Sequence, residues 1–451
     1  MDPSKPLTDL PMPPRDRLVG RLTGQALQMR ADHHELIHRT MQTCGDYGRL
    51  RLFTVDAIVI SSPAGATSVL QANAARYDKQ NHGYREVARV LGDGLFTADG
   101  EHWKRNRVRL QPFFTRKTLA HYGTKMRRHS EALVEALGSR SGDPLAFDEE
   151  MVALTLRILG DCLFDEDFEP YVPLMLEEFG TVLQIVDERV INHVPFVDAL
   201  NVPKERRFQA SLARFEQAVD ELIDKALADE ARAASATSMV HALVADPATA
   251  DRRNVRDQVI TMMFAGHETS AVALQWVFVM LATHPSWRAK VEEEVDQAES
   301  FDDLPLLERV IQETLRLYPP VWIVTRRIAG PEPVDIDGTS VNPGTLVLVS
   351  PFTIHRNPRY WPDPDRFDPD RFLPERTAEH LKGQYIPFGM GKRACVGKQM
   401  AMLEMKTIVA TLVRSLRFDL PAGHEVRIAS SLTLRPAGGT PMVCRRRGES
   451  P

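Results

Sequence analysis

The residues with the clearest chemical potential lie in one glycine-flanked decapeptide, Phe388–Gly397 (FGMGKRACVG). A helical pattern, KQMAMLEMKTIVATLV, follows it directly, so Cys395 is expected near a helix N-terminus. There the helix dipole and the free backbone N–H groups favour negative charge on sulfur. The glycines allow the backbone to approach a flat ligand closely. These conditions suit a thiolate bound to iron, which favours cleavage of an O–O bond.

A second segment that could do chemistry is AGHETS, Ala265–Ser270, inside a long apolar stretch. An acid beside an alcohol, Glu268 and Thr269, suits proton delivery directly or through water. The ordinary alternative is that the Thr269 hydroxyl only bonds back to a helix carbonyl. His267-Glu268 also begins a zinc-protease motif, but Ala271 stands where the second histidine is required, which excludes that site.

Together these segments resemble the cytochrome P450 family. Phe388–Gly397 matches every specified position of the family's haem loop, Phe-x-x-Gly-x-Arg/His-x-Cys-x-Gly, and further family features follow in order from about Gly92 to the C-terminus. The resemblance implies haem b, iron protoporphyrin IX, with Cys395 as the axial ligand of the iron. It also implies that Thr269 holds water or peroxide and that Glu268 relays protons. The commoner role of a cysteine, a buried inert thiol, is the alternative.

The resemblance extends to side chains for the haem propionates. Trp103 and Arg107 form a Trp-x-x-x-Arg segment, and Arg393 occupies a second propionate position. Arginine suits a carboxylate because its fork can bind two oxygens. Arg327 is a third candidate, with Arg326 as the open alternative. The expected cofactor-binding residues are Cys395, Trp103, Arg107, Arg327, Phe388 and Arg393.

A structural role is expected for Glu313 and Arg316 of a Glu-Thr-Leu-Arg segment. Their i, i+3 spacing places them on one helix face. As a surface ion pair they would contribute under about 1 kcal/mol. The family resemblance implies instead a buried Glu-Arg-Arg network with Arg371, which would hold the irregular, proline-rich stretch 357–387 behind the haem loop.

The substrate pocket follows from the resemblance only loosely. The expected positions are apolar, as suits a hydrophobic small molecule: Leu95, Phe96, Ala265, Val321 and Ile323. Each could equally be a core residue. The apolar stretch 190–202 could form part of an access lid. The glutamate of AGHETS and the segment PPVWIVTRR look like relatives that oxidise fatty acids or terpenoids, which is an argument by analogy.

Electrons are expected from a separate protein. Only 56 residues follow Cys395, too few for a flavin or nicotinamide domain, so an external donor or hydrogen peroxide must serve. Residues 101–128 carry nine Lys or Arg and one acid, Glu101, and Lys392 and Lys398 flank Cys395. These charges could dock an acidic ferredoxin or flavodoxin, supplied by its reductase. A solvated helix face is the alternative.

Composition fits this interpretation. Hydrophobic residues make up 43% and charged residues 26%, as in a globular protein, and the formal net charge of -5 does not suggest a nucleic-acid partner. The first residues, MDPSKPLTDLPMPPRD, contain no apolar run, so we expect no membrane anchor and a soluble, cytoplasmic protein. The four cysteines form no Cys-x-x-Cys pair, which argues against structural zinc and a disulfide framework.

The elements that must position these residues are mostly helices. Apolar periodicity predicts helices within 101–137, over 151–163 and over 208–228, and a shorter helix over 306–318 that ends at Pro319-Pro320. A long buried helix should begin near Asn254 and stop before Pro285. Short strands are expected in 334–338, 339–345 and 345–351. We therefore predict a mainly α protein with small β-sheets, one domain over 1–451, with a flexible segment 1–20, a loop over 231–238 and a disordered tail 445–451.

Four functions stay in competition. The preferred one is a monooxygenase that uses dioxygen to hydroxylate or epoxidise a fatty acid, terpenoid or secondary metabolite. A haem-thiolate enzyme of peroxide-driven oxidation or rearrangement is second, and the Glu268–Thr269 pair argues against it. A haem sensor would bind carbon monoxide without turnover, and a scaffold without haem would lack a Soret band.

Overall fold

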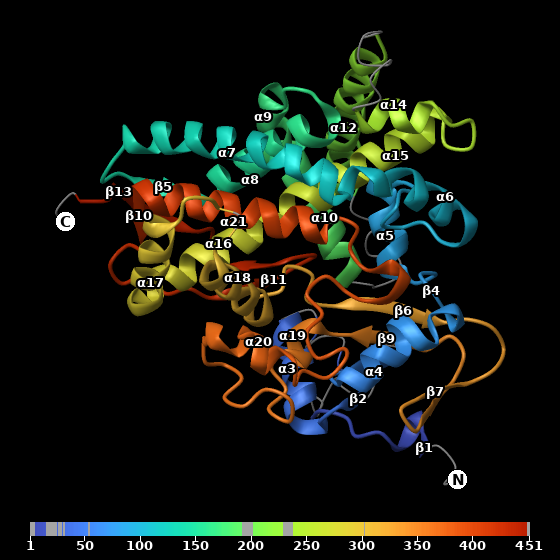
Figure 1. Cartoon of the computed structure of the whole chain (residues 1–451). Coiled ribbons are helices and arrows are strands. Elements are labelled where there is room, and N and C mark those ends of the chain that lie inside the picture. The colour runs from blue at the N-terminus through green and yellow to red at the C-terminus, as the bar shows by residue number, and fades with distance from the viewer. Residues whose placement is uncertain are drawn as a thin grey trace.

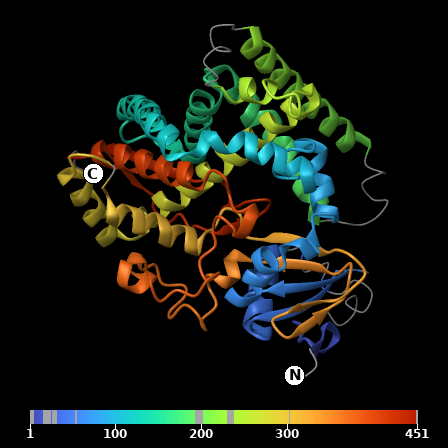
Figure 2. The same cartoon turned by 45° about the vertical axis from the view of Figure 1, so that its right-hand side comes forward.

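The computed structural model of the chain describes residues 5–14, 25, 29, 32–52, 55–191, 202–228, 238–301 and 303–448. A large helical part lies on one side of the molecule, and a smaller part built around a β-sheet lies on the other (Figures 1 and 2). The predicted class, mainly α with small sheets, is confirmed. The expected loop 231–238 lies outside the described residues except for Ser238, and so does most of the expected lid 190–202.

The bounds of the elements are as follows. The helices are α3 His33–Cys44, α4 Pro63–Thr67, α5 His82–Leu91, α6 Gly100–Leu110, α7 Arg116–Gly138, α8 Phe147–Leu159, α9 Val172–Leu174, α10 Gly180–Ile191, α12 Val202–Ala228, α14 Met239–Val244, α15 Arg252–Met263, α16 Thr269–Thr283, α17 Pro285–Gln297, α18 Pro305–Leu317, α19 Pro351–Ile354, α20 Pro374–Thr377 and α21 Lys398–Ser415. The strands are β1 Lys5–Pro6, β2 Tyr47–Leu52, β3 Val55–Ile60, β4 Tyr77–Asp78, β5 Pro144–Ala146, β6 Val324–Ile328, β7 Val334–Ile336, β8 Thr339–Val341, β9 Leu346–Val349, β10 Leu416–Asp419, β11 Ile428–Ser430, β12 Leu434–Pro436 and β13 Pro441–Arg446.

The long central helix consists of α15, a π-helical turn over Phe264–Glu268 and α16. It ends at Thr283, before Pro285, as predicted. It begins earlier than predicted, because the Asp251 carboxylate accepts the amide N–H of Asn254 and acts as the N-cap. Asn254 uses its own side chain to bond Asn106 of α6. Nearly every side chain of α16 is buried, so this helix forms the centre of the main core.

The main sheet has five strands in the order β2-β3-β9-β6-β4. Strand β9 is central, parallel to β3 and antiparallel to β6. The sequence predicted β7, β8 and β9 but missed β2 and β3. Leu50, Ala57 and Val59 of these strands pack with α3, whereas Ile58 and Ile60 belong to a second cluster. Strand β3 is therefore buried on both faces, and a short apolar run of this kind has no period that can be recognised by itself.

Both predicted flexible ends are partly ordered. At the N-terminus, β1 pairs in parallel with β8, with Lys5 opposite Thr339, and Leu7 is buried. At the C-terminus, Arg445 and Arg446 lie in β13, which pairs with β10, and Arg447 forms an ion pair with Asp296 at 2.7 Å. The prediction of disorder was therefore wrong for residues 445–448, because backbone pairing and an ion pair hold them.

Candidate active site

The Cys395 loop is held by its own backbone. The Cys395 amide donates to the Phe388 carbonyl at 2.9 Å, and α21 starts three residues later. Gly391 has a positive φ of 72°, and a Cβ there would lie 2.2 Å from the carbonyl oxygen of Leu70. Only glycine satisfies both the conformation and the close approach. The sequence pattern therefore places the sulfur at the start of α21, as expected.

The electrostatics of Cys395 differ from the expectation. Its sulfur accepts hydrogen bonds from the amides of Gly397 and Lys398, and the charge of Arg107 is nearby. All three lower the pKa of the thiol, but burial outweighs them and raises it. The helix N-terminus alone therefore does not make a thiolate here. A metal ion that binds this sulfur must itself drive the loss of the proton.

Burial also indicates an internal space beside the loop. Cys395 has an accessible side chain although protein surrounds it. In the central helix, Ala265, Gly266 and Thr269 are partly accessible, whereas their neighbours are buried. These three positions lie on one helix face. An accessible sulfur and an accessible small-residue face, both inside the fold, fit a flat group bound between them.

The acid and the alcohol of AGHETS, Glu268 and Thr269, have separate partners. The Thr269 hydroxyl donates to the Ala265 carbonyl at 2.7 Å, which is the back-bond considered from the sequence. Glu268 is buried, and its Oε1 accepts the hydroxyl of Thr433 at 3.1 Å. The guanidinium of Arg435 lies 3.7 Å from the same oxygen. Thr433 and Arg435 come from the β11–β12 hairpin, and the sequence analysis did not identify either of them.

A cluster of positively charged side chains lies beside the Cys395 loop. The Arg393 guanidinium lies 4.0 Å from the centre of the Trp103 ring, donates to the Ala98 carbonyl and pairs with Asp99. Lys79 is buried nearby, and burial together with the charges of Arg393 and Arg326 holds its pKa well below the usual range. Such an excess of buried and half-buried cations over anions fits the two carboxylates of a haem.

The two arginines of β6 point in different directions. Arg326 donates to the Tyr84 hydroxyl at 3.2 Å and interacts with Lys79 and Arg393. Arg327 forms a two-bonded ion pair with Asp78 of β4, at 3.0 and 2.6 Å. Successive residues of a strand face opposite sides of the sheet, so only one of the two can join the cationic cluster. The structure favours Arg326 over Arg327. Lys79 was missed because no motif marks it.

The other expected cofactor residues lie around the loop. Arg107 donates to the Ala394 carbonyl at 3.2 Å and interacts with Cys395. Phe388 packs against the main core, and the Lys398 ammonium lies 5.9 Å from its ring centre. The six candidates therefore lie on α6, β6 and the Cys395 loop, and five of them contact the loop or the cationic cluster beside it.

The expected pocket residues are divided between two regions. The Leu95 amide donates to the Gln258 side chain of α15 at 2.9 Å, and the Phe96 ring lies 6.2 Å from that of Phe264, edge to face. This places 95 and 96 beside the central helix that carries Ala265. Ile323 packs instead against the small core of α3 and the main sheet. Val321 is partly buried at the turn before β6.

The expected structural network is present behind the loop. Glu313 and Arg316 are fully buried, and the carboxylate contacts the guanidinium at 2.6 and 2.8 Å. Arg371 lies 3.4 Å from the same carboxylate. Arg316 also donates to the carbonyls of His355, Pro364 and Arg366. The network therefore ties α18 to the irregular stretch at several backbone points.

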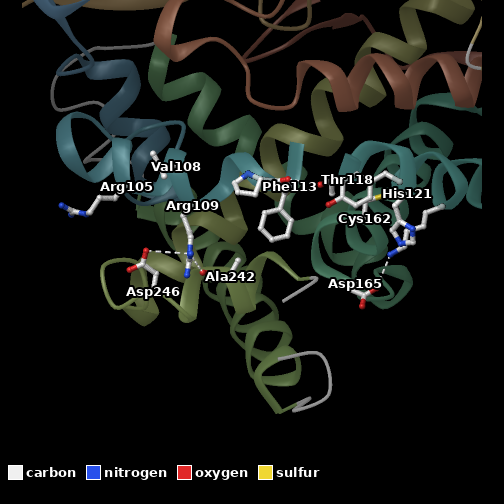
Figure 3. Close-up of a pocket in the computed structure, with 13 residues that line it drawn as sticks. Arg105, Val108, Arg109, Phe113, Thr118, His121, Cys162, Asp165, Ala242 and Asp246 are labelled. Carbon is white, nitrogen blue, oxygen red and sulfur yellow. Dashed lines mark hydrogen bonds and ion pairs between the residues drawn. The ribbon is translucent and has the colours of Figure 1, made fainter. Parts of the chain in front are cut away.

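A separate groove of about 570 Å³ lies between α6, α7 and α14 (Figure 3). Two of its basic side chains have acidic partners. Arg109 pairs with Asp246 at 3.9 Å, and Lys125 contacts Asp161 and Asp165 at 2.9 and 3.2 Å. None of the expected haem or pocket residues lines it. This groove is therefore not the candidate active site.

Comparisons with known proteins agree with this arrangement. A family model described as Cytochrome P450 matches residues 12–440. Cyclooctatin synthase of Streptomyces melanosporofaciens is 33% identical, over 92% of this chain and 91% of the relative. Pentalenene oxygenase of Streptomyces avermitilis is 31% identical, over 92% and 93%. The crystal structure of CYP175A1 from Thermus thermophillus superposes with a TM-score of 0.77 at 28% identity, over 96% of this chain and all of the other. Within the described residues, no helix has the length and apolar character needed to cross a bilayer.

Proposed function

The chain belongs to the cytochrome P450 family and is a haem b-dependent monooxygenase, and from this premise we propose that it oxidises a terpenoid with electrons from a separate redox protein. The observation that carries the haem-dependent oxidation is the accessible Cys395 inside the fold, beside buried Lys79 and the half-buried Arg326 and Arg393. Hydroxylation of a C–H bond and epoxidation of a C=C bond are the two reactions proposed.

The residues proposed to hold the haem follow from the geometry. Cys395 would bind the iron through its sulfur. The propionates would be held by Arg393, Arg326 and Lys79, with Trp103 stacked on Arg393. Arg107 lies beside the sulfur, where its charge stabilises the thiolate. Phe388 and the open glycine backbone form the wall of the loop. Bound in this way, the group supplies activation of dioxygen.

The protein's own contribution to the reaction is positioning and proton transfer. The small residues Ala265 and Gly266 leave room on the accessible face of the central helix. The Thr269 hydroxyl donates to a carbonyl, so its oxygen can still accept a hydrogen bond from water. Glu268 carries a proton from the interior toward that hydroxyl. When this proton transfer fails, reducing equivalents are expected to be lost as hydrogen peroxide and no oxidised substrate forms.

A terpenoid is the substrate class best supported. Pentalenene oxygenase is named for the oxidation of pentalenene, a terpenoid hydrocarbon. The proposed pocket residues beside the central helix, Leu95, Phe96 and Ala265, are apolar, as a hydrocarbon substrate requires. Fatty acids would bring a carboxylate to this pocket and serve as the comparison class in a screen.

The proposed electron donor is an acidic ferredoxin or flavodoxin. Lys104, Lys392 and Lys398 are exposed on α6 and around the Cys395 loop. A cationic surface at this loop attracts an acidic partner and brings its redox centre close to the sulfur. We also propose a cytoplasmic location, because the four cysteines are far apart in the sequence and form no Cys-x-x-Cys pair, which suits a reducing compartment.

The test is spectroscopic first and catalytic second. Reduced, iron-replete protein with carbon monoxide is expected to absorb near 450 nm, roughly where thiolate-ligated haem does. Cys395→Ala is expected to abolish that absorption. Terpenoids and fatty acids are then screened by their spin-state shifts, and the best binder is offered with ferredoxin, reductase and dioxygen. Colourless protein, or an unchanged band in Cys395→Ala, would reject the proposal.

A further inference from the structure

The β11–β12 hairpin reaches into the fold and ends between two helices. Its strands pair from Ile428 opposite Pro436 to Ser430 opposite Leu434. Two indole groups hold the hairpin in place. Trp276 of α16 donates to the Leu434 carbonyl, and Trp322 donates to the Ser431 carbonyl, each at 2.8 Å. The tip, residues 431–433, is therefore in a fixed position relative to the central helix.

On one side the hairpin contacts the proposed proton-transfer acid. The Thr433 hydroxyl donates to Glu268 Oε1 at 3.1 Å, and Arg435 Nη2 lies 3.7 Å from that same atom. Arg435 Nη2 also donates to the Ser431 hydroxyl at 2.8 Å, which fixes the guanidinium. Both contacts to Glu268 are on Oε1, which leaves Oε2 to carry a proton.

On the other side the hairpin contacts an acid of α10. The Leu432 amide donates a hydrogen bond to the Asp187 carboxylate, and the charge of Arg435 also acts on it. Burial raises the pKa of Asp187 to about 7, so its charged form depends on these two contacts. Two acids from two helices thus share one cation, Arg435, whose Nε is buried without a hydrogen-bond partner.

We propose that Arg435 and Thr433 are positioning residues that orient Glu268 for proton transfer, and that Asp187 holds the same hairpin tip from α10. The inference rests on the proposed function, because it assigns the supports of the acid proposed there. A carboxylate that must deliver a proton needs a fixed orientation toward the acceptor. A misplaced carboxylate loses much of its effect on the rate of proton transfer. The hairpin supplies that direction through a hydroxyl donor and a cation.

The main test is Arg435→Met, which removes the charge and keeps most of the side chain length. The matched control is Arg427→Met at the base of the same hairpin, where Arg427 is exposed and pairs with the exposed Glu425. With a bound substrate, product and hydrogen peroxide are measured per reducing equivalent. Arg435→Met is expected to lower the product yield roughly tenfold. This is less than the about 10²- to 10⁴-fold effect of a proton-transfer group itself, because Arg435 only positions that group. Arg427→Met is expected to leave it unchanged.

A purely structural role is separated by three further measurements. Arg435→Lys is expected to restore most of the yield, since it restores the charge. In a Glu268→Gln background, Arg435→Met is expected to cause no further loss, because it acts through that carboxylate. Deuterium uptake at the backbone of residues 428–436, measured without turnover, is expected to rise in Arg435→Met and in Asp187→Asn but not in Arg427→Met.

Several outcomes would overturn the inference. An unchanged product yield in Arg435→Met is one, and an equal further loss in the Glu268→Gln background is another. If Arg435→Met does not fold, Thr433→Val and Asp187→Asn decide, and wild-type yield and uptake in both would reject it. The proposed function fails by a different result, in which the unsubstituted protein binds haem but oxidises none of the terpenoids, whether or not it oxidises a fatty acid.

Discussion

At the scale of a single side chain, two roles are considered for Thr269: a local hydrogen bond within the helix and proton delivery. Its hydroxyl donates to the Ala265 carbonyl, a bond that many helical threonines make. Its position on the accessible face of the central helix is less common, because the surrounding residues are buried. The first role predicts a local effect on the helix, and the second predicts an effect on proton delivery. A substitution can separate the two.

Thr269→Ala is expected to keep the reduced carbon monoxide band and the substrate-induced spin shift, because neither needs the hydroxyl. Reducing equivalents are expected to leave as hydrogen peroxide, with product yield lowered roughly tenfold or more. Product and peroxide per reducing equivalent are the measurement. Thr269→Ser serves as the control, since it restores the hydroxyl. Equal coupling in the alanine variant and the wild type would contradict the proton-transfer role.

Glu404 is a second side chain with an unusual environment. It lies on α21, is almost fully buried and accepts the Ser270 hydroxyl at 2.7 Å. Burial raises the pKa of Glu404 to about 8, above its value of 4.5 in an unfolded chain. The folded protein therefore keeps a neutral carboxyl here at pH 7, and this carboxyl ties α21 to the central helix.

The pH dependence follows from that difference. Below about pH 4.5 Glu404 is protonated in both the folded and the unfolded protein, so it does not lower the free energy of unfolding. Between about pH 4.5 and 8 only the unfolded chain loses this proton, so the free energy of unfolding falls as the pH rises. Glu404→Gln keeps a hydrogen-bond acceptor and cannot ionise. Its stability relative to the wild type is expected to rise by roughly a few kcal/mol from pH 5 to pH 8 in denaturant titrations. The exposed Glu425→Gln should show no such rise, and a flat Glu404→Gln difference would contradict the raised pKa.

At the scale of elements, α18 holds the irregular stretch 357–387 in place. This stretch contains short turns and the four-residue helix α20, so its own hydrogen bonds do not define its path. Glu313 accepts the Asp368 amide at 2.8 Å, while Arg316 binds three carbonyls. The ion pair is buried, so each charge depends on the other.

Glu313→Gln is expected to lower the free energy of unfolding by about 3–5 kcal/mol, because it leaves two buried guanidinium groups without a carboxylate. Chemical denaturation of the haem-loaded protein measures this. Glu308→Gln in the first turn of the same helix is exposed and should cost less than about 1 kcal/mol. A loss as small as that of Glu308→Gln would show that the network does not hold the stretch.

At the scale of the whole molecule, we treat the chain as one functional domain, since the sheet part and the helical part both contribute to the proposed site. Helix α6, strand β6 and the loop before α21 each supply residues to it. The surface outside the loop carries exposed lysines, whereas the groove of Figure 3 lies on another part of the surface and contains Arg109 and Lys125, which pair with acids. The proposed donor therefore docks at the loop and not in the groove.

Lys392→Glu with Lys398→Glu is expected to lower the rate of electron transfer from an acidic ferredoxin by roughly tenfold at low salt, because the partner now meets like charge. The difference should shrink as ionic strength rises. Stopped-flow reduction at several salt concentrations measures both effects. Lys290→Glu on α17 is an exposed control of the same charge change. An unchanged rate of electron transfer in the double variant would show that the donor does not dock at Lys392 and Lys398.

The sequence by itself determined the class of the fold and the positions of long helices such as α7, α8, α12, α16, α18 and α21, although it missed α3, α5, α10 and α17. It also predicted the chemistry of the cysteine loop. A motif such as FGMGKRACVG fixes residue types at fixed spacing, and helical periodicity is a local property of the chain. The proximity of Glu313 and Arg316 could be predicted for the same reason, since both residues lie on one turn of helix, whereas their burial was implied by the family resemblance and not by the spacing.

Only the tertiary structure decided which distant residues support that chemistry. Arg326 and Arg327 are adjacent in sequence, and the facing of β6 alone separates them. Lys79 and Arg393 are brought together across more than 300 residues. Asp187, whose pKa burial raises to about 7, is likewise brought to Arg435 across more than 200 residues. Such contacts depend on packing between elements, which local sequence patterns do not specify. A pKa shift caused by burial, such as that of the Cys395 thiol, likewise arises only after those elements have packed.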